Sequence, residues 1–195
     1  MVCLISVNKF AFLEGQASQV APQLLGCLLE REINGQKLIG RIVEVEAYDE
    51  TDASSHSYKG RTARTEVMFG PSGFLYVYFT YGMHYCCNII TGPTGYGSAV
   101  LIRAIEPIKG EELMESKRNG QTGVNLSNGP AKLCQALSID KNLNGHNLAS
   151  SPLKLIVPAT RGVDQIVQTT RIGITKAKDL QWRFYIAKNP YVSRP

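Results

Sequence analysis

The sequence is poor in the residues that build metal centres and disulfide frameworks. It contains three histidines and five cysteines, an odd number of cysteines with no C-x-x-C pair. This usage is typical of reduced thiols in an intracellular protein, in the cytoplasm or nucleoid of a bacterium or the nucleus of a eukaryote. No histidine lies at a spacing that would gather cysteine or carboxylate ligands around an ion. We therefore expect no metal ion and no cofactor.

Long apolar runs are also missing. The run at residues 74–79 is far shorter than the roughly 20 residues that cross a bilayer. The N-terminus lacks a basic flank followed by a long apolar stretch. No repeat, low-complexity tract or linker divides the 195 residues. We expect no membrane insertion, a single domain over residues 1–195 and a monomer.

Acidic residues are outnumbered. Sixteen aspartates and glutamates face 21 lysines and arginines, which gives a net charge of +5. Such an excess favours a polyanionic partner such as nucleic acid, although most basic side chains simply solvate a surface.

Turn signals and hydrophobic periodicity predict hairpins with a few short helices. The helices are expected at residues 16–25, 107–118 and 130–137. The strands are expected at residues 27–33, 36–48, 74–80, 83–90, 98–106, 153–157, 169–174 and 182–187. Asn34-Gly35 tolerates positive φ and suits a tight hairpin. Because hairpins dominate, we expect an α+β fold built on a curved, mostly antiparallel β-sheet with flanking short helices.

Residues 41–48 (RIVEVEAY) place two carboxylates and an aromatic ring on one face of a predicted strand. Successive strand side chains alternate in direction, so Glu44, Glu46 and Tyr48 point the same way. A buried carboxylate needs water or a partner, so this face is either wet surface or the wall of a site. Arg103 interrupts an apolar run and must also reach water or an acceptor such as Glu44 or Glu46. It is either a structural ion pair or an arginine that orients a carboxylate and a water molecule.

Aromatic and amide side chains recur on the next two predicted strands. Tyr76 and Tyr78 share one face, where they either stack a flat ligand or pack a second core. Tyr81 follows at the turn and either inserts into a base stack or caps the hairpin. Asn88 carries an amide that needs partners at both ends if it is buried. The polar segment 49–65 begins directly after the face with Glu46 and Tyr48 and is either mobile or shaped for binding.

These residues together resemble the alkyladenine (3-methylpurine) DNA glycosylase family. The resemblance rests on Asn88 and on residues 41–48, 53–57, 68–69, 75–83, 100–107 and 128–137, in order along nearly the whole chain. It implies a monofunctional DNA glycosylase of base excision repair. Such an enzyme flips alkylated or deaminated purines (3-methyladenine, 7-methylguanine, hypoxanthine, ethenoadenine) out of double-stranded DNA and hydrolyses the N-glycosidic bond with water, leaving an abasic site.

The resemblance also implies roles in the reaction. Glu46 would be the general base that activates water, and Arg103 would help to position that water. The walls and selectivity of the base pocket would come from Tyr48, His56, Tyr76, Tyr78 and Asn88, with Asn88 disfavouring the 2-amino group of guanine.

At the DNA interface, the resemblance implies that Tyr81 fills the vacated stack, with Met83 and Arg171 also contacting DNA. Ser54 and Ser55 stand where relatives often carry alanine. Because the family contacts there use main-chain amides, this departure bears on the polarity of the pocket rather than on activity.

Two other functions stay open from the residues themselves. One is a module that recognises distorted DNA without cleaving a bond. Such a module would not need Glu46, Tyr48 and Arg103 together, so their presence argues against it. The other is a carboxylate-dependent hydrolase of free nucleosides, which would need neither the basic excess nor an aromatic residue at a hairpin tip. An enzyme that acts on DNA is the interpretation these features favour.

Overall fold

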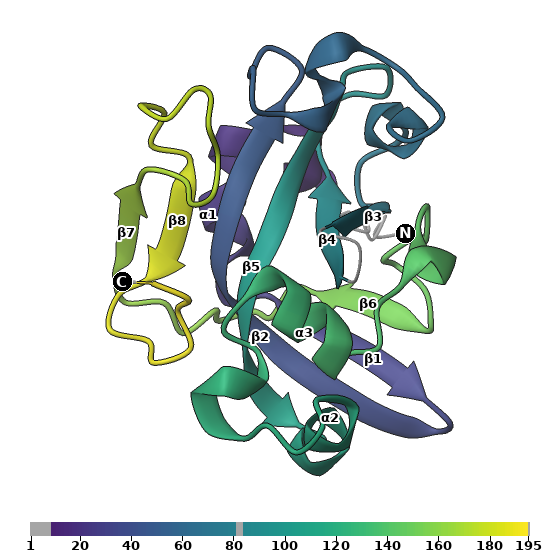
Figure 1. Ribbon diagram of the computed structural model, residues 1–195, viewed down its shortest axis with the longest axis vertical. Coiled ribbons are helices and arrows are strands. Elements are labelled where there is room, and N and C mark those ends of the chain that lie inside the picture. The colour runs from purple at the N-terminus through teal and green to yellow at the C-terminus, as the bar shows by residue number, and fades with distance from the viewer. Residues whose placement is uncertain (1–8, 81–83, 195) are drawn as a thin grey trace, which may run out of the picture.

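The computed structural model describes residues 9–80 and 84–194. One eight-stranded sheet curls through this part of the chain, and every strand pairing in it is antiparallel. The strands are β1 (Leu28–Ile33), β2 (Gln36–Asp49), β3 (Leu75–Thr80), β4 (His84–Ile90), β5 (Ser98–Lys109), β6 (Leu153–Ile156), β7 (Ile166–Thr169) and β8 (Arg183–Ile186). The helices are α1 (Ala17–Leu24), α2 (Glu111–Lys117) and α3 (Pro130–Ala136). The expected α+β fold is confirmed (Figure 1).

Strand β2 organises the sheet. Its 14 residues pair with β5 along one edge. The other edge is divided, because residues 36–41 pair with β1 and residues 44–46 pair with β8. In Figure 1 the β7–β8 pair accordingly stands apart from the end of the sheet that holds β1 and β6. The middle of β2 is therefore covered on both edges and carries the most enclosed side chains of the strand.

A β-bulge interrupts the pairing of β2 with β5. Glu44 pairs with Ala104 and Val45 pairs with Ile102, so β5 has Arg103 as an extra residue between them. A bulge bends the strand and redirects a side chain. Here it turns Arg103 toward the two carboxylates of β2, with which the side chain forms ion pairs.

The main hydrophobic core forms where helices meet the sheet. Helix α1 packs on β2 and β5, and α3 packs on β4 and β5. A second, smaller core lies under the polar loop and contains Met68, Phe69, Tyr76, Ile90 and Ala99. Tyr76, which is expected to form part of the binding pocket, is therefore packed into this smaller core.

Most predicted elements lie where expected, with three corrections. The helix predicted from residue 107 begins at Glu111, because β5 continues to Lys109. The strand predicted at residues 169–174 is wrong, because β7 ends at Thr169 and the chain then leaves the sheet. Strand alternation places Phe79 on an apolar face with Leu75 and Val77, but Phe79 is 51% exposed because it lies near the end of β3, an edge strand. Within the described residues, no helix has both the length and the apolar character needed to cross a membrane.

Two glycines with left-handed backbone provide a test of the packing. Gly26 follows α1 at φ +81°, and a Cβ there would overlap the carbonyl oxygen of Arg161 and lie 2.7 Å from its Cβ. Gly35, in the β1–β2 turn, has φ +77° but open space around it. We expect Gly35→Ala to lower the free energy of unfolding by about 1–2 kcal/mol through backbone strain alone.

Gly26→Ala adds steric overlap to that strain and should cost at least about 1 kcal/mol more. Chemical denaturation of the two variants measures the difference. Equal losses would contradict the close packing of residue 26 against residue 161.

Candidate active site

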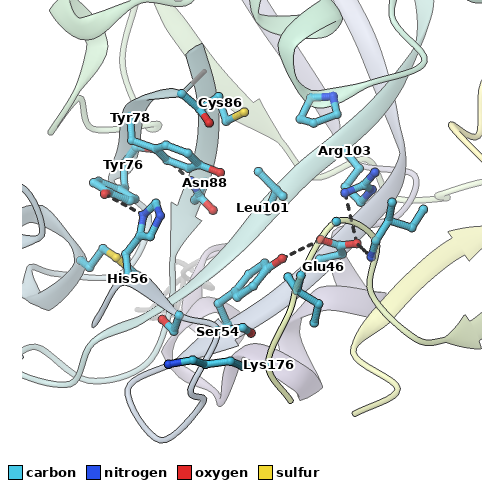
Figure 2. A pocket seen from close by; sticks show the side chains of 18 of the residues that line it. Glu46, Ser54, His56, Tyr76, Tyr78, Cys86, Asn88, Leu101, Arg103 and Lys176 are labelled. Carbon is cyan, nitrogen blue, oxygen red and sulfur yellow. Dashed lines mark hydrogen bonds and ion pairs between the residues drawn. The ribbon is translucent and has the colours of Figure 1, made fainter. Parts of the chain in front are cut away.

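A pocket of about 540 Å³ gathers most of the residues that the sequence singles out. Its lining includes residues of the four strands β2, β3, β4 and β5, of the 53–56 segment and of the 172–176 segment. The predicted site residues that line it are Glu46, Tyr48, His56, Tyr76, Tyr78, Asn88 and Arg103. Figure 2 shows the rings of Tyr76, Tyr78 and His56 on one side of the pocket and the charged pair of Glu46 and Arg103 on the other.

Glu46 has no exposed side-chain surface and is held by three donors. Its Oε1 accepts a hydrogen bond from the backbone N–H of Ile172 at 2.8 Å and forms an ion pair with Arg103 Nη1 at 3.2 Å. Its Oε2 accepts a hydrogen bond from the hydroxyl of Tyr48 at 2.8 Å. A carboxylate offers about four acceptor positions, so these contacts leave Oε2 able to accept one more hydrogen bond.

Glu44 is equally buried but differently occupied. Its Oε1 accepts from Arg103 Nε, Arg183 Nε and Ser193 Oγ, at distances of 3.1, 2.7 and 2.9 Å. Its Oε2 accepts from the backbone N–H of Ser193 at 2.7 Å. Glu44 does not line the pocket. The alternation of β2 could not separate these two carboxylates, whereas their surroundings leave only Glu46 facing a ligand space.

Arg103 contacts both buried carboxylates of β2. It forms ion pairs with Glu44 and with Glu46, at 3.1 and 3.2 Å, and it also lines the pocket. Burial alone would lower the pKa of Arg103, but Glu46 and Glu44 together raise it above its ordinary value. The guanidinium therefore stays charged and provides a fixed positive group beside Glu46.

Three rings form the aromatic wall. Tyr76 and Tyr78 stack with ring centroids 5.6 Å apart, and the His56 ring packs edge-on against Tyr78 at 4.6 Å. His56 Nδ1 is hydrogen-bonded to the Tyr76 hydroxyl at 3.1 Å. Packing in a second core is seen for Tyr76, and both tyrosines also line the pocket, so stacking of a flat ligand stays a prediction. Burial raises the pKa of Tyr78 well above its ordinary value, so its phenol stays neutral.

Asn88 and Cys86 form the part of the wall contributed by β4. Asn88 is buried, and its amide nitrogen donates to the carbonyl of Tyr76 at 3.3 Å. This bond satisfies one end of the amide and leaves its oxygen for other partners. Cys86 pairs with Tyr78 across the hairpin, and burial raises the pKa of its thiol to about 11. The thiol is therefore uncharged and a poor nucleophile at neutral pH.

Arg171, expected at the DNA interface, lies elsewhere. Its side chain has no exposed surface and donates to both carboxylate oxygens of Asp52 and to the carbonyl of Ala47. The guanidinium also lies over the Tyr48 ring, 4.6 Å from its centroid. A side chain held in this way cannot reach a phosphate, so the expected contact of Arg171 with DNA does not fit its position. Tyr81 and Met83, also expected at that interface, lie outside the described residues.

The serines at positions 54 and 55 turn their hydroxyls to neighbours in their own loop. Ser54 Oγ donates to Asp52, and Ser55 Oγ shares a hydrogen bond with Ser57 Oγ at 2.7 Å. The departure from alanine is therefore accommodated inside the loop.

Several lining residues were missed from the sequence. A strand was expected at residues 169–174, yet the chain leaves the sheet after Thr169, and the 172–176 segment contributes Ile172, Gly173 and Lys176 to the pocket. Arg64 was not singled out, although its guanidinium lies 5.7 Å from the centroid of Tyr78. No local periodicity marks either feature, since both depend on contacts between distant parts of the chain. Among residues 9–80 and 84–194, no group of three histidine, cysteine, aspartate or glutamate residues is placed to hold a metal ion.

The position of Arg64 gives a prediction for His56. Partial desolvation by the surrounding rings and the charge of Arg64 both lower the pKa of His56 below its ordinary value. Arg64 Nη2 also lies 3.5 Å from His56 Nε2. Arg64→Gln removes the neighbouring charge, so the pKa of His56 should rise while staying below the ordinary value, because the desolvation remains. An NMR titration of the imidazole in both proteins measures the change, and an unchanged or lower pKa would contradict it.

Comparisons with known proteins show which family the chain belongs to. The family model of methylpurine-DNA glycosylase matches residues 11–190. A protein of Carboxydothermus hydrogenoformans is 53% identical over 176 residues, covering 90% of this chain and 92% of its own. A protein of Methanoculleus marisnigri is 50% identical over 189 residues, covering 94% and 97%. Both carry provisional names as 3-methyladenine DNA glycosylases. The resemblance drawn from the sequence is confirmed, and the chain belongs to the methylpurine-DNA glycosylase family, enzymes that hydrolyse N-glycosyl bonds in the repair of alkylated DNA.

Proposed function

We propose that this enzyme flips alkylated or deaminated purines out of double-stranded DNA and hydrolyses their N-glycosidic bond with a water molecule activated by Glu46. The environment of Glu46 carries the proposal. The carboxylate is fully buried, lines the pocket, lies beside Arg103 and keeps one acceptor position after its three contacts. A carboxylate placed in this way can accept a proton from water and face a developing positive charge.

The chemistry needs such a group at the sugar rather than at the base. A purine alkylated at N3 or N7 carries positive charge and leaves readily, whereas the sugar becomes oxocarbenium-like as the bond breaks. At a separation of ~4 Å and an effective dielectric of ~20, a carboxylate and this cation attract by about 4 kcal/mol before desolvation. Because Glu46 has no exposed surface, water reaches it only after the lining of the pocket shifts, which we assign to the entry of the nucleotide.

The remaining pocket residues suit a flat, extruded base. The volume of about 540 Å³ falls within the range of small-molecule sites. Tyr48 and Tyr78 offer ring faces for stacking, and a stacked base gains ~1–3 kcal/mol, similar to the few kcal/mol that flipping costs. Asn88 would oppose the 2-amino group of guanine. In this proposal Tyr81 fills the vacated position in the duplex, with Met83 beside it.

We further propose that the substrates are 3-methyladenine, 7-methylguanine, hypoxanthine and ethenoadenine, and that the enzyme works inside the cell as a monomer. Arg64 and Lys176, at exposed positions beside the pocket, supply positive charge near the path of the DNA backbone. Binding should therefore weaken with salt.

Exchanging each of the two buried carboxylates tests the general base. Glu46→Gln should bind damaged duplex DNA but release the base about 10²- to 10⁴-fold more slowly, because an amide cannot accept the proton of water. Glu44→Gln is the matched control on the same strand. It should lose less than about tenfold in rate yet unfold at a lower temperature. The amide nitrogen of glutamine cannot accept a hydrogen bond, so a buried donor that now binds Glu44 would be left unpaired.

Single-turnover excision from duplexes carrying one lesion each, with thermal unfolding of both variants, makes this comparison. Near-normal excision by Glu46→Gln, or a larger loss of rate in Glu44→Gln than in Glu46→Gln, would refute the assignment of Glu46 as the general base.

A covalent mechanism gives a different outcome. Lys176 brings an amine to the pocket, and an amine nucleophile would form an imine with the sugar. Water activated by Glu46 forms no such bond. Incubation with substrate and borohydride should therefore trap no adduct between protein and DNA, and a trapped adduct that disappears in Lys176→Met would overturn the proposed mechanism.

A further inference from the structure

Asp52 and Arg171 form a buried ion pair beside the pocket without lining it. Neither side chain has exposed surface, and the two residues are 119 positions apart in the sequence. Burying such a pair has a large desolvation cost, so the pair is by itself weak evidence for a gain in stability. Its location suggests another reason for its presence. Each residue directly precedes a segment that lines the pocket, since residues 53–56 follow Asp52 and residues 172–176 follow Arg171.

Arg171 connects its segment to strand β2. Its Nη1 donates to the carbonyl of Ala47 at 2.9 Å, between Glu46 and Tyr48 in the sequence. Its Nη2 donates to the carbonyl of Ala177 at 3.3 Å, just beyond the 172–176 segment. The guanidinium also lies over the ring of Tyr48. One side chain thus holds both ends of the 172–176 segment near the strand that carries Glu46.

Asp52 connects the other segment to Arg171. Besides accepting from Arg171, its Oδ1 accepts from the backbone N–H of Ser54 at 3.0 Å and from the Ser54 hydroxyl at 2.8 Å. Burial alone would raise the pKa of Asp52, but the hydrogen bonds from Arg171 and Ser54 hold it below the ordinary value. The carboxylate is therefore ionised at neutral pH and can serve both partners.

Ile172, the residue after Arg171, contacts Glu46, the proposed general base. The backbone N–H of Ile172 donates to Glu46 Oε1 at 2.8 Å. We propose that Asp52 and Arg171 are a positioning pair, which holds the 53–56 and 172–176 segments against β2 and so keeps the Ile172 N–H on Glu46. This inference rests on the proposed role of Glu46 as general base.

The pair acts through a hydrogen bond to the ionised form of a carboxylate. Losing that donor removes a hydrogen bond that favours the ionised form over the neutral one, so the acid limb of the pH–rate profile should move to higher pH. Neither substitution, of Asp52 or of Arg171, replaces any of the other titratable or charged groups around Glu46. They are Glu44 and Tyr48 on β2, Arg103 on β5, Arg183 on β8, Tyr78 on β3, Cys86 on β4, and His56 and Lys176 on the two segments.

Two variants with opposite changes in charge separate positioning from simple electrostatics. Asp52→Asn removes a negative charge and Arg171→Gln removes a positive one. Acting only through charge, they would move the acid limb in opposite directions, down for Asp52→Asn and up for Arg171→Gln. If the pair positions Ile172, both variants lose the hydrogen bond from the Ile172 N–H to Glu46. The acid limb of each variant should then move to higher pH by about one unit.

The measurement is the single-turnover excision of hypoxanthine from a duplex across the pH range, with thermal unfolding of each protein. Both variants should also lose at least about tenfold in rate at neutral pH, because misplacing a reacting group by 1 Å can cost up to 10²-fold. Arg41→Gln is the matched control. It breaks the ion pair between Arg41, on the same strand as Glu46, and Glu106 on β5, away from the pocket. This variant should lower the unfolding temperature without moving the acid limb.

Limbs that move in opposite directions, or that stay at the wild-type position in folded variants, would overturn the positioning pair. Glu46→Gln is measured beside them to keep the two proposals distinct. If Glu46→Gln retains excision, the general base is wrong. If Glu46→Gln is inactive while Asp52→Asn and Arg171→Gln keep the wild-type profile, only the positioning pair is wrong.

Discussion

Two buried carboxylates at the centre of one strand impose the main constraint on this structure. Glu44 and Glu46 have no exposed side-chain surface, and ions removed from water are costly unless charge and hydrogen bonds compensate them. The chain compensates them with two arginines from neighbouring strands, Arg103 on β5 and Arg183 on β8. The bulge that redirects Arg103 and the division of the edge of β2 between β1 and β8 both follow from bringing these guanidiniums to the carboxylates.

The two carboxylates then diverge in function because their remaining partners differ. Glu44 is saturated by Ser193 together with both arginines, so it neutralises the interior and anchors the last described segment of the chain. Glu46 receives fewer donors and opens onto the pocket. Since Arg103 binds both, it transmits the position of the saturated carboxylate to the unsaturated one. A site built in this way is held in place by residues that never contact the substrate.

The sequence predicted what depends on local pattern. Alternation placed Glu44, Glu46 and Tyr48 on one face, and hairpin signals placed Tyr76 and Tyr78 together, as the structure has them. Local pattern could not distinguish Glu44 from Glu46, because the difference comes from Ser193, 149 residues away. It also failed for residues 170–174, the part of the predicted strand that follows Thr169. That stretch has the apolar alternation of a strand, but Arg171 binds Asp52 and draws the chain away from the sheet. A long-range ion pair overrode strand propensity there, and this same departure from the sheet produced part of the pocket.

The pocket that results has a charged floor and a neutral aromatic wall, with the exposed Lys176 as a further charged residue of its lining. The contrast between floor and aromatic wall bears on how the pocket could act on different lesions. Burial, together with the nearby charge of Glu46, raises the pKa of Tyr48 well above its ordinary value, and burial does the same for Tyr78. Partial desolvation and Arg64 lower the pKa of His56. All three wall groups are therefore neutral near pH 7, and the fixed charges that line the floor are those of Glu46 and Arg103. In the proposed reaction the base would lie among neutral rings, which accept cationic and neutral purines alike, while the negative charge would face the sugar. Electrostatic stabilisation would then act on the cation that every substrate forms at the sugar, rather than on the charge that only some bases carry. One pocket could in that way process lesions of different charge, with the ease of departure of each base setting its rate.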